Sequence, residues 1–215
     1  MKKRAAFLVG TGFVLLAASA FLAVNNYIEG ANAAISAKVL AEAYLSRASV
    51  YEAPVIEAAS GTVQIETIDV NENRSAVEQM PVKQPIVVDG QEYIGLLSIP
   101  SLGVNLPVNN DISYPLLKRS PCRYFGSAEE GPLVIAAHNY DSHFGKIGTL
   151  QPGDTVNISG ADGKSERYIV SEVLTLSSDD VDEMIKPGGW DLTLFTCTYS
   201  GTERITVRCE KEDRL

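Results

Sequence analysis

The sequence predicts a mainly β domain that is preceded by a long apolar helix. From residue 86 onward, short runs of β-branched and apolar residues alternate with turns that contain Gly or Pro. Several short strands at this spacing are typical of a β-barrel or a β-sandwich. Residues 5–24, by contrast, carry no charge and are typical of a membrane-spanning helix. Residues 54–85 separate the two parts and have little hydrophobic periodicity.

The N-terminal segment is predicted to anchor the chain in the cell membrane. Three basic residues at positions 2–4 precede the charge-free run, which at about 1.5 Å per residue spans about 30 Å, the thickness of a bilayer's hydrocarbon core. The positive-inside rule places the N-terminus in the cytoplasm and the rest of the chain outside, in a single pass. The alternative is a cleaved signal peptide, because residues 18–20 and 31–33 resemble cleavage sites.

We expect three segments along the chain. Residues 1–30 form a cytoplasmic tip and a transmembrane anchor. Residues 31–85 form a helical stalk and a linker, because an Ala-rich stretch is followed by an irregular one with prolines at positions 54, 81 and 85. Residues 86–215 form the β domain. The strands predicted there cover 93–99, 104–108, 133–137, 155–158, 167–176, 192–197 and 204–209, with a short helix over 181–186.

The composition narrows the possible functions. The formal net charge is −9, so the chain lacks the basic face of a nucleic-acid-binding protein. Its acidic residues match neither an EF-hand loop nor the ligand spacing of a zinc site, and we expect no metal. The three cysteines, at positions 122, 197 and 209, are too few for a disulfide scaffold. An odd number in an exported chain indicates a free thiol, although a Cys122–Cys209 bridge is possible from the count.

The C-terminal hairpin is the most informative stretch. If it folds symmetrically about Ser200 and Gly201, Cys197 lies directly opposite Arg204 on one face of the sheet. The alternation of side chains turns the other face of the hairpin toward the core. A thiol beside a permanent cation is stabilised as the thiolate, which is the nucleophile. The alternative is that Cys197 is a small buried hydrophobe at the end of an apolar strand.

Two histidines are candidates for an acid–base partner. His138 directly follows the apolar run 133–137, and reactive groups commonly lie where a strand ends. A cysteine nucleophile is often served by a histidine that is distant in sequence and adjacent in the fold. His143 lies in a polar stretch that reads as a loop and is the weaker candidate. For both, the alternative is an ordinary loop or core histidine.

These residues resemble the sortases, the cysteine transpeptidases of Gram-positive cell surfaces. Residues 193–197, Thr-Leu-Phe-Thr-Cys, match the family's Thr-Leu-x-Thr-Cys signature, and Arg204 matches the arginine on the next strand. His138 resembles the family's catalytic histidine, although Ala137 stands where the family often has Gly. The resemblance covers about residues 86–210 together with the anchor, and it is to class B or class D members, between which the sequence does not choose.

The resemblance implies a fold and a set of roles. The fold would be a closed β-barrel of about eight strands with short helices. Cys197 would attack the Thr–Gly bond of a sorting signal of the Leu-Pro-x-Thr-Gly type and form a thioester. His138 would protonate the leaving amine and then deprotonate the incoming one. Arg204 would position the substrate and stabilise the oxyanion, which suits a permanently charged group with several donors. Thr196 would support the site by hydrogen bonding.

The resemblance also implies partners. The substrate would be a surface protein or a pilin, and the acceptor an amine such as that of a cell-wall peptidoglycan precursor. No cofactor is expected; some family members bind calcium, but no loop here demands it. Arg208 is a rival to Arg204, yet it lies about 13 Å farther along the strand. Residues 179–190 are a candidate for shielding the thioester from water, with a packing role for Trp190 as the alternative.

Two other functions remain compatible with the residues. The chain could be a non-catalytic anchored β-barrel that binds surface proteins or pilins. It could instead be a cysteine peptidase that only hydrolyses, and the use of an amine acceptor separates this function from transpeptidation.

Overall fold

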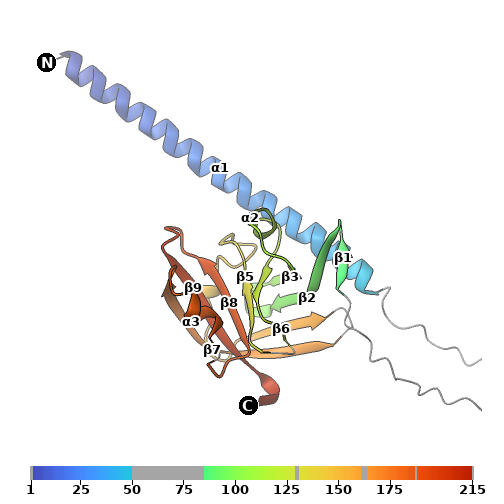
Figure 1. Ribbon diagram of the computed structural model, residues 1–215. Coiled ribbons are helices and arrows are strands. Elements are labelled where there is room, and N and C mark those ends of the chain that lie inside the picture. Colours follow the sequence, from blue (N-terminus) through green and yellow to red (C-terminus); the bar gives the residue numbers. More distant parts are fainter. Residues whose placement is uncertain (1, 50–84, 129–130, 161–163, 187, 215) are drawn as a thin grey trace, which may run out of the picture.

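The fold is a closed β-barrel with a long N-terminal helix lying against it (Figure 1). The computed structural model describes residues 2–49, 85–128, 131–160, 164–186 and 188–214. The linker expected over residues 54–85 lies, except for its last residue, outside this part of the chain. The first element, α1 (Lys2–Ala48), is one continuous helix that runs across the expected boundary at residue 30.

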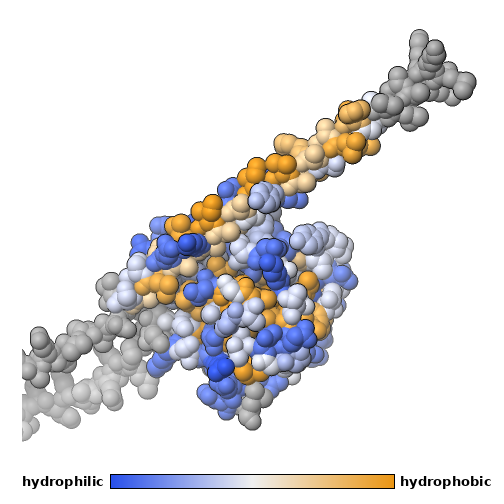
Figure 2. All heavy atoms as spheres, turned by 180° about the vertical axis from the view of Figure 1, so that it is seen from behind, coloured by the Kyte–Doolittle hydropathy of each residue, from blue (hydrophilic) through white to orange (hydrophobic). Residues whose placement is uncertain are grey.

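The two halves of α1 have different surroundings. From Gly10 onward the helix is long and apolar enough to cross a membrane, and its most apolar window is not covered by the rest of the chain. Exposed apolar side chains follow this half of the helix (Figure 2). In the second half, one face packs on the barrel through a stripe spaced by three or four residues, as expected for an amphipathic helix. The buried residues of this stripe are Ala33, Ala37, Leu40, Ala41 and Tyr44.

Eight strands close the barrel in the order β2-β3-β4-β5-β8-β9-β7-β6, and β6 pairs back with β2. This confirms the closed barrel of about eight strands that the resemblance implied. A short ninth strand, β1, pairs with the start of β2. The strands are β1 (Ile86–Val88), β2 (Gln91–Ile99), β3 (Val104–Asn109), β4 (Cys122–Phe125), β5 (Leu133–Ala136), β6 (Thr155–Gly160), β7 (Ser165–Ser177), β8 (Leu192–Cys197) and β9 (Glu203–Lys211).

Short helical segments fill the connections between the strands. The predicted helix over residues 181–186 is α3 (Val181–Ile185). The sequence did not predict α2 (Tyr114–Leu117) or the strand β4, because each has only four residues and no clear periodicity. Single-turn 3-10 segments are η2 (Pro100–Leu102), η3 (Ile147–Thr149) and η4 (Glu212–Arg214).

Apolar side chains bury both faces of β8. The inward face contributes Leu192 and Leu194 to the main core, together with Val207 and Cys209 of β9, as the alternation predicted. The outward face, which we expected to be less apolar, is also covered. There Phe195 packs with Met184 of α3 and with the outward residues of β5 in a second cluster. A central strand covered on both faces has its register fixed from both sides.

The loop between β5 and β6 closes part of the barrel and buries His143. Its apolar residues Phe144, Ile147 and Leu150 are in the main core. The turn needs glycine at position 145, since a Cβ there would lie 2.7 Å from the Asn139 carbonyl oxygen. His143 is fully buried, and burial, followed by the nearby His138, lowers the pKa of His143 from 6.5 to about 4.

This burial predicts a dependence of stability on pH. Because the folded pKa of His143 lies below its unfolded value, the unfolded chain takes up a proton that the folded chain refuses. The stabilisation is complete above pH 6.5 and is lost as the pH falls toward 4, by about 3 kcal/mol in all. We expect His143→Phe, which keeps a buried ring but cannot be protonated, to reduce this loss. Urea unfolding of the full chain in detergent micelles, followed by the fluorescence of its single tryptophan, measures it. Equal losses of stability between pH 6.5 and 4 in the parent and in His143→Phe would contradict the assignment of this loss to His143.

Candidate active site

The ends of three neighbouring strands bring His138, Cys197 and Arg204 to one level of the barrel wall. Strands β5 and β8 run parallel, and their register pairs Ala136 with Phe195. The pairing continues beyond the strand, because the Ala137 amide donates to the Phe195 carbonyl oxygen at 3.2 Å. Two residues past the last pair, the same register sets His138 beside Cys197.

The hairpin of β8 and β9 adds the arginine on the other side of the cysteine. Cys197 and Arg204 are direct partners in the antiparallel ladder, which confirms the symmetric hairpin. The turn closes with hydrogen bonds from the Thr198 amide to the Glu203 carbonyl oxygen and from the Gly201 amide to the Thr198 carbonyl oxygen, both 3.0 Å. Gly201 has a φ of +76°, a conformation that favours glycine.

The three residues belong to the outer face of the barrel. Ala136 and Phe195 lie in the outer apolar cluster, and the period of two places His138 and Cys197 on the same side. Thr196 points the other way and is fully buried. Its hydroxyl donates to the Ala137 carbonyl oxygen at 2.9 Å, which ties the ends of β5 and β8 together. Thr196 therefore holds the strand ends that carry the histidine and the cysteine.

Cys197 is the exposed cysteine of the chain. All three cysteines are free, so the possible bridge between Cys122 and Cys209 does not form. Those two thiols are buried, and burial raises the pKa of each to about 12. They are therefore protonated and out of contact with solvent, whereas Cys197 can meet a substrate.

The two arginines on this face of β9 differ in their contacts. Arg204 is half-buried, and its guanidinium donates to the carbonyl oxygens of Gly201 and Glu203 at the turn, at 2.9 and 3.0 Å. No carboxylate among the described residues pairs with it. Arg208 is nearly buried, lies 2.9 Å from a Glu172 carboxylate oxygen and stacks 3.6 Å from the Trp190 ring.

Arg208 therefore serves the structure around α3. It pairs with Thr193 in the ladder, four residues before Cys197, as its position in the sequence predicted. Its guanidinium also donates to the Glu183 carbonyl oxygen of α3 at 3.0 Å. Trp190 packs on Arg208, which matches the packing alternative for this residue. Gly188 permits this arrangement, since a Cβ there would collide with the Trp190 ring.

Aromatic rings surround His138. The Tyr140 ring lies parallel to the imidazole, with 4.1 Å between the centroids and 5° between the planes. The Tyr114 ring is 5.9 Å away and tilted. The His138 Nδ1 atom lies 3.0 Å from the Asn139 amide oxygen. Sequence reasoning missed Tyr114 and Tyr140, and the only signal for Tyr140 was an aromatic residue two positions after the histidine.

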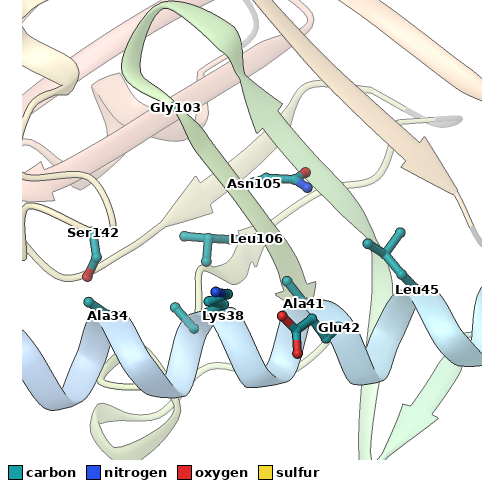
Figure 3. A pocket seen from close by; sticks show the side chains of 10 residues that line it. Ala34, Lys38, Ala41, Glu42, Leu45, Gly103, Asn105, Leu106 and Ser142 are labelled. Carbon is teal, nitrogen blue, oxygen red and sulfur yellow. The ribbon is translucent and has the colours of Figure 1, made fainter.

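Neither a metal cluster nor the cavity beside α1 coincides with this site. In the part of the chain that the structure describes, no group of three or more His, Cys, Asp or Glu side chains could hold a metal ion. A cavity of about 380 Å³ lies between α1 and β3, with Lys38, Glu42, Asn105 and Ser142 among its lining residues (Figure 3). None of His138, Cys197 and Arg204 lines it.

Comparisons with known proteins show which family the chain resembles. The family model described as a sortase domain matches residues 97–212. A solved sortase C from Clostridium perfringens SM101 has 28% identity and a TM-score of 0.51, over 57% of this chain and 71% of its own. The pilus-related sortase C of Group B Streptococcus has 26% identity and a TM-score of 0.50, over 55% of this chain and 66% of its own.

Similar folds extend to other sortase classes. The Clostridium perfringens sortase D5 transpeptidase has 23% identity and a TM-score of 0.50, over 56% of this chain and 79% of its own, and this shows the fold alone. No curated protein matches the chain. Sortases A, C and D all match, so the similarity is at the level of the family. The family model covers more than half of the sequence. The chain therefore belongs to the sortase family, as a cysteine transpeptidase.

Proposed function

We propose that this sortase cleaves a sorting signal of the Leu-Pro-x-Thr-Gly type between Thr and Gly and transfers the acyl group to an amine. The observation that carries the proposal is that His138 follows β5 by two residues while the neighbouring strands β8 and β9 carry Cys197 and Arg204, with Cys197 exposed. A nucleophile flanked by an acid–base group and a fixed cation is the arrangement that acyl transfer needs.

Cys197 and His138 carry out the covalent steps. The thiol passes its proton to His138, and the thiolate attacks the threonyl carbonyl carbon. The C–N bond then breaks, His138 returns the proton to the departing glycine amine, and a thioester remains on Cys197. In the second half-reaction an incoming amine attacks the thioester, His138 takes its proton, and the thiolate leaves. No cofactor takes part in this sequence of steps.

Arg204 stabilises the charge that develops on the carbonyl oxygen in both half-reactions. Its guanidinium is held by two carbonyl oxygens of the turn, so little reorganisation is needed when the oxyanion forms. Several of its N–H groups remain available for a substrate oxygen. Thr196 acts indirectly, because its hydrogen bond to the Ala137 carbonyl oxygen fixes the ends of β5 and β8.

The apolar N-terminal helix supports a place at the cell membrane. We propose a single pass through α1, with the N-terminus in the cytoplasm and the barrel, as residues 86–215, outside. The substrate is then a surface protein or a pilin, and the acceptor is an amine of the cell wall or of a pilin. Assays with defined peptides and amines would determine the sortase subclass and the identity of the acceptor.

The thioester is the first testable consequence. Mixing the full chain in detergent micelles with a panel of Leu-Pro-x-Thr-Gly-like peptides should add the mass of the peptide's N-terminal fragment, as measured by intact-mass spectrometry. Cys197→Ala should lose this adduct and keep its fold. Cys122→Ala is the matched control and should keep the adduct, because that thiol is buried. An adduct in Cys197→Ala would contradict the proposal.

The two arginines should separate chemistry from stability. We expect Arg204→Ala to lower kcat/KM by about 10²- to 10³-fold with little change in the melting temperature, because an oxyanion donor is lost. Arg204→Lys should recover part of the rate. Arg208→Ala should mainly lower the melting temperature, since Glu172 and Trp190 lose their shared partner. The reverse pattern would make Arg208 the functional arginine.

An amine acceptor separates transfer from hydrolysis. With oligoglycine present, we expect a ligated peptide whose yield rises with amine concentration, because the amine competes with water for the same thioester. Quantifying ligated and hydrolysed product by chromatography gives the ratio. Hydrolysed product alone, at every amine tested, would support the hydrolytic peptidase.

A further inference from the structure

One contact joins the anchor helix α1 to the aromatic rings around His138. Glu29, on α1, accepts a hydrogen bond from the Tyr140 hydroxyl at 3.3 Å. Its other carboxylate oxygen lies 3.6 Å from the Lys118 ammonium, which in turn lies 5.2 Å from the centre of the Tyr114 ring. Both aromatic neighbours of His138 therefore connect to a single carboxylate.

Hydrogen bonds hold Tyr140 both at its backbone and at its ring hydroxyl. On the backbone side, its carbonyl oxygen accepts hydrogen bonds from the amides of His143 and Gly145, both at 2.9 Å. On the other side the hydroxyl donates to Glu29. Burial, followed by the charge of Glu29, raises the pKa of the Tyr140 hydroxyl, so the group keeps the proton that it donates. Removing Glu29 would release one of the two ends.

A parallel stack restricts how the imidazole can turn. The rings of His138 and Tyr140 are only 5° from parallel, and a rotation of the imidazole about its bond to Cβ would break the contact. Acyl transfer needs this imidazole to face first the thiol and then the two amines. Small displacements of a reacting group are costly, and 1 Å can cost about 10²-fold in rate.

We propose that Tyr140 is a positioning residue for His138 and that Glu29 of the anchor helix holds Tyr140 in place. The proposal rests on the acid–base role proposed for His138. Glu29 lies five residues beyond Val24, the last residue before the polar pair Asn25 and Asn26, which is about 7.5 Å along the helix. The helix that anchors the chain thus also supports the active site.

A double-mutant cycle on the full chain in detergent micelles tests this connection. Tyr140→Phe removes the donor of the hydrogen bond and keeps the stacked ring, whereas Glu29→Gln removes the charge of the acceptor, which weakens the hydrogen bond and ends the ion pair with Lys118. We expect each to lower kcat for peptide transfer by about threefold to tenfold with an unchanged KM, and the double variant to lose no more than either single one. Tyr140→Leu, which removes the ring, should lose more.

Control variants come from the same helix. Glu42→Gln and Tyr27→Phe change exposed residues of α1 that do not contact the aromatic rings around His138, and both should keep the parent kcat. Losses that add in the double variant, or a rise in KM with kcat unchanged, would overturn the proposal. So would an equal loss in Glu42→Gln, because the effect would then not depend on Glu29.

The two histidine rings supply a readout that does not depend on activity. Selective labelling gives an NMR spectrum with two sets of ring signals, from His138 and His143. We expect Glu29→Gln to shift the His138 signals, and the shift to disappear when the change is made in the Tyr140→Phe background. Coincident His138 signals in parent and Glu29→Gln would overturn the proposal. If the parent forms no thioester, the proposed function fails, and these signals still decide whether the helix holds the ring.

Discussion

The parallel register between β5 and β8 is the constraint on which the active site depends. A slip of one residue would turn His138 or Cys197 to the opposite face of the barrel wall. The register is held from both sides, because Ile135 and Leu194 lie in the core while Ala136 and Phe195 lie in the outer cluster. The hydroxyl of Thr196 adds a bond between the two strand ends, one residue from the cysteine. Apolar packing and one buried hydroxyl thus align the strand ends that carry His138 and Cys197.

The two arginines of β9 show how environment, and not residue type, separates a structural cation from the one that we propose to be functional. They lie four residues apart on the same face. Arg208 is covered by the α3 region, and its charge is matched by Glu172 and by the face of Trp190. Leaving such a buried cation unpaired would be costly, so it is committed to the fold. Arg204 lies near the start of β9, beside an exposed turn whose backbone carbonyl oxygens orient the guanidinium without neutralising it. Its charge therefore remains available to a substrate.

The parts of the site that sequence could predict are the local ones. The pairing of Cys197 with Arg204 follows from a short loop and strict alternation, and the structure has that register. The alignment of β5 with β8 joins residues 59 positions apart. The place of His138 directly after the run 133–137 made it a candidate and the family resemblance favoured it, but no local pattern predicted this pairing of strands. Strand β4 was missed because it is four residues long and pairs with β3 at a single position. The role of Tyr140 depends on a contact across 111 positions, which no periodicity encodes.

In the proposed topology, the continuous helix α1 gives the barrel a fixed relation to the membrane. Small residues such as Ala33, Ala37 and Ala41 let the helix lie close to the barrel, and Tyr44 packs with Tyr93 beyond them. No proline interrupts the helix between this packed face and the apolar half. With the apolar half spanning the bilayer as proposed, the barrel cannot turn freely about a flexible stalk. Glu29, which lies between the apolar half of α1 and its packed half, contacts the loop that carries His138 and Tyr140. In the proposed topology, the active site is therefore held on the membrane side of the barrel.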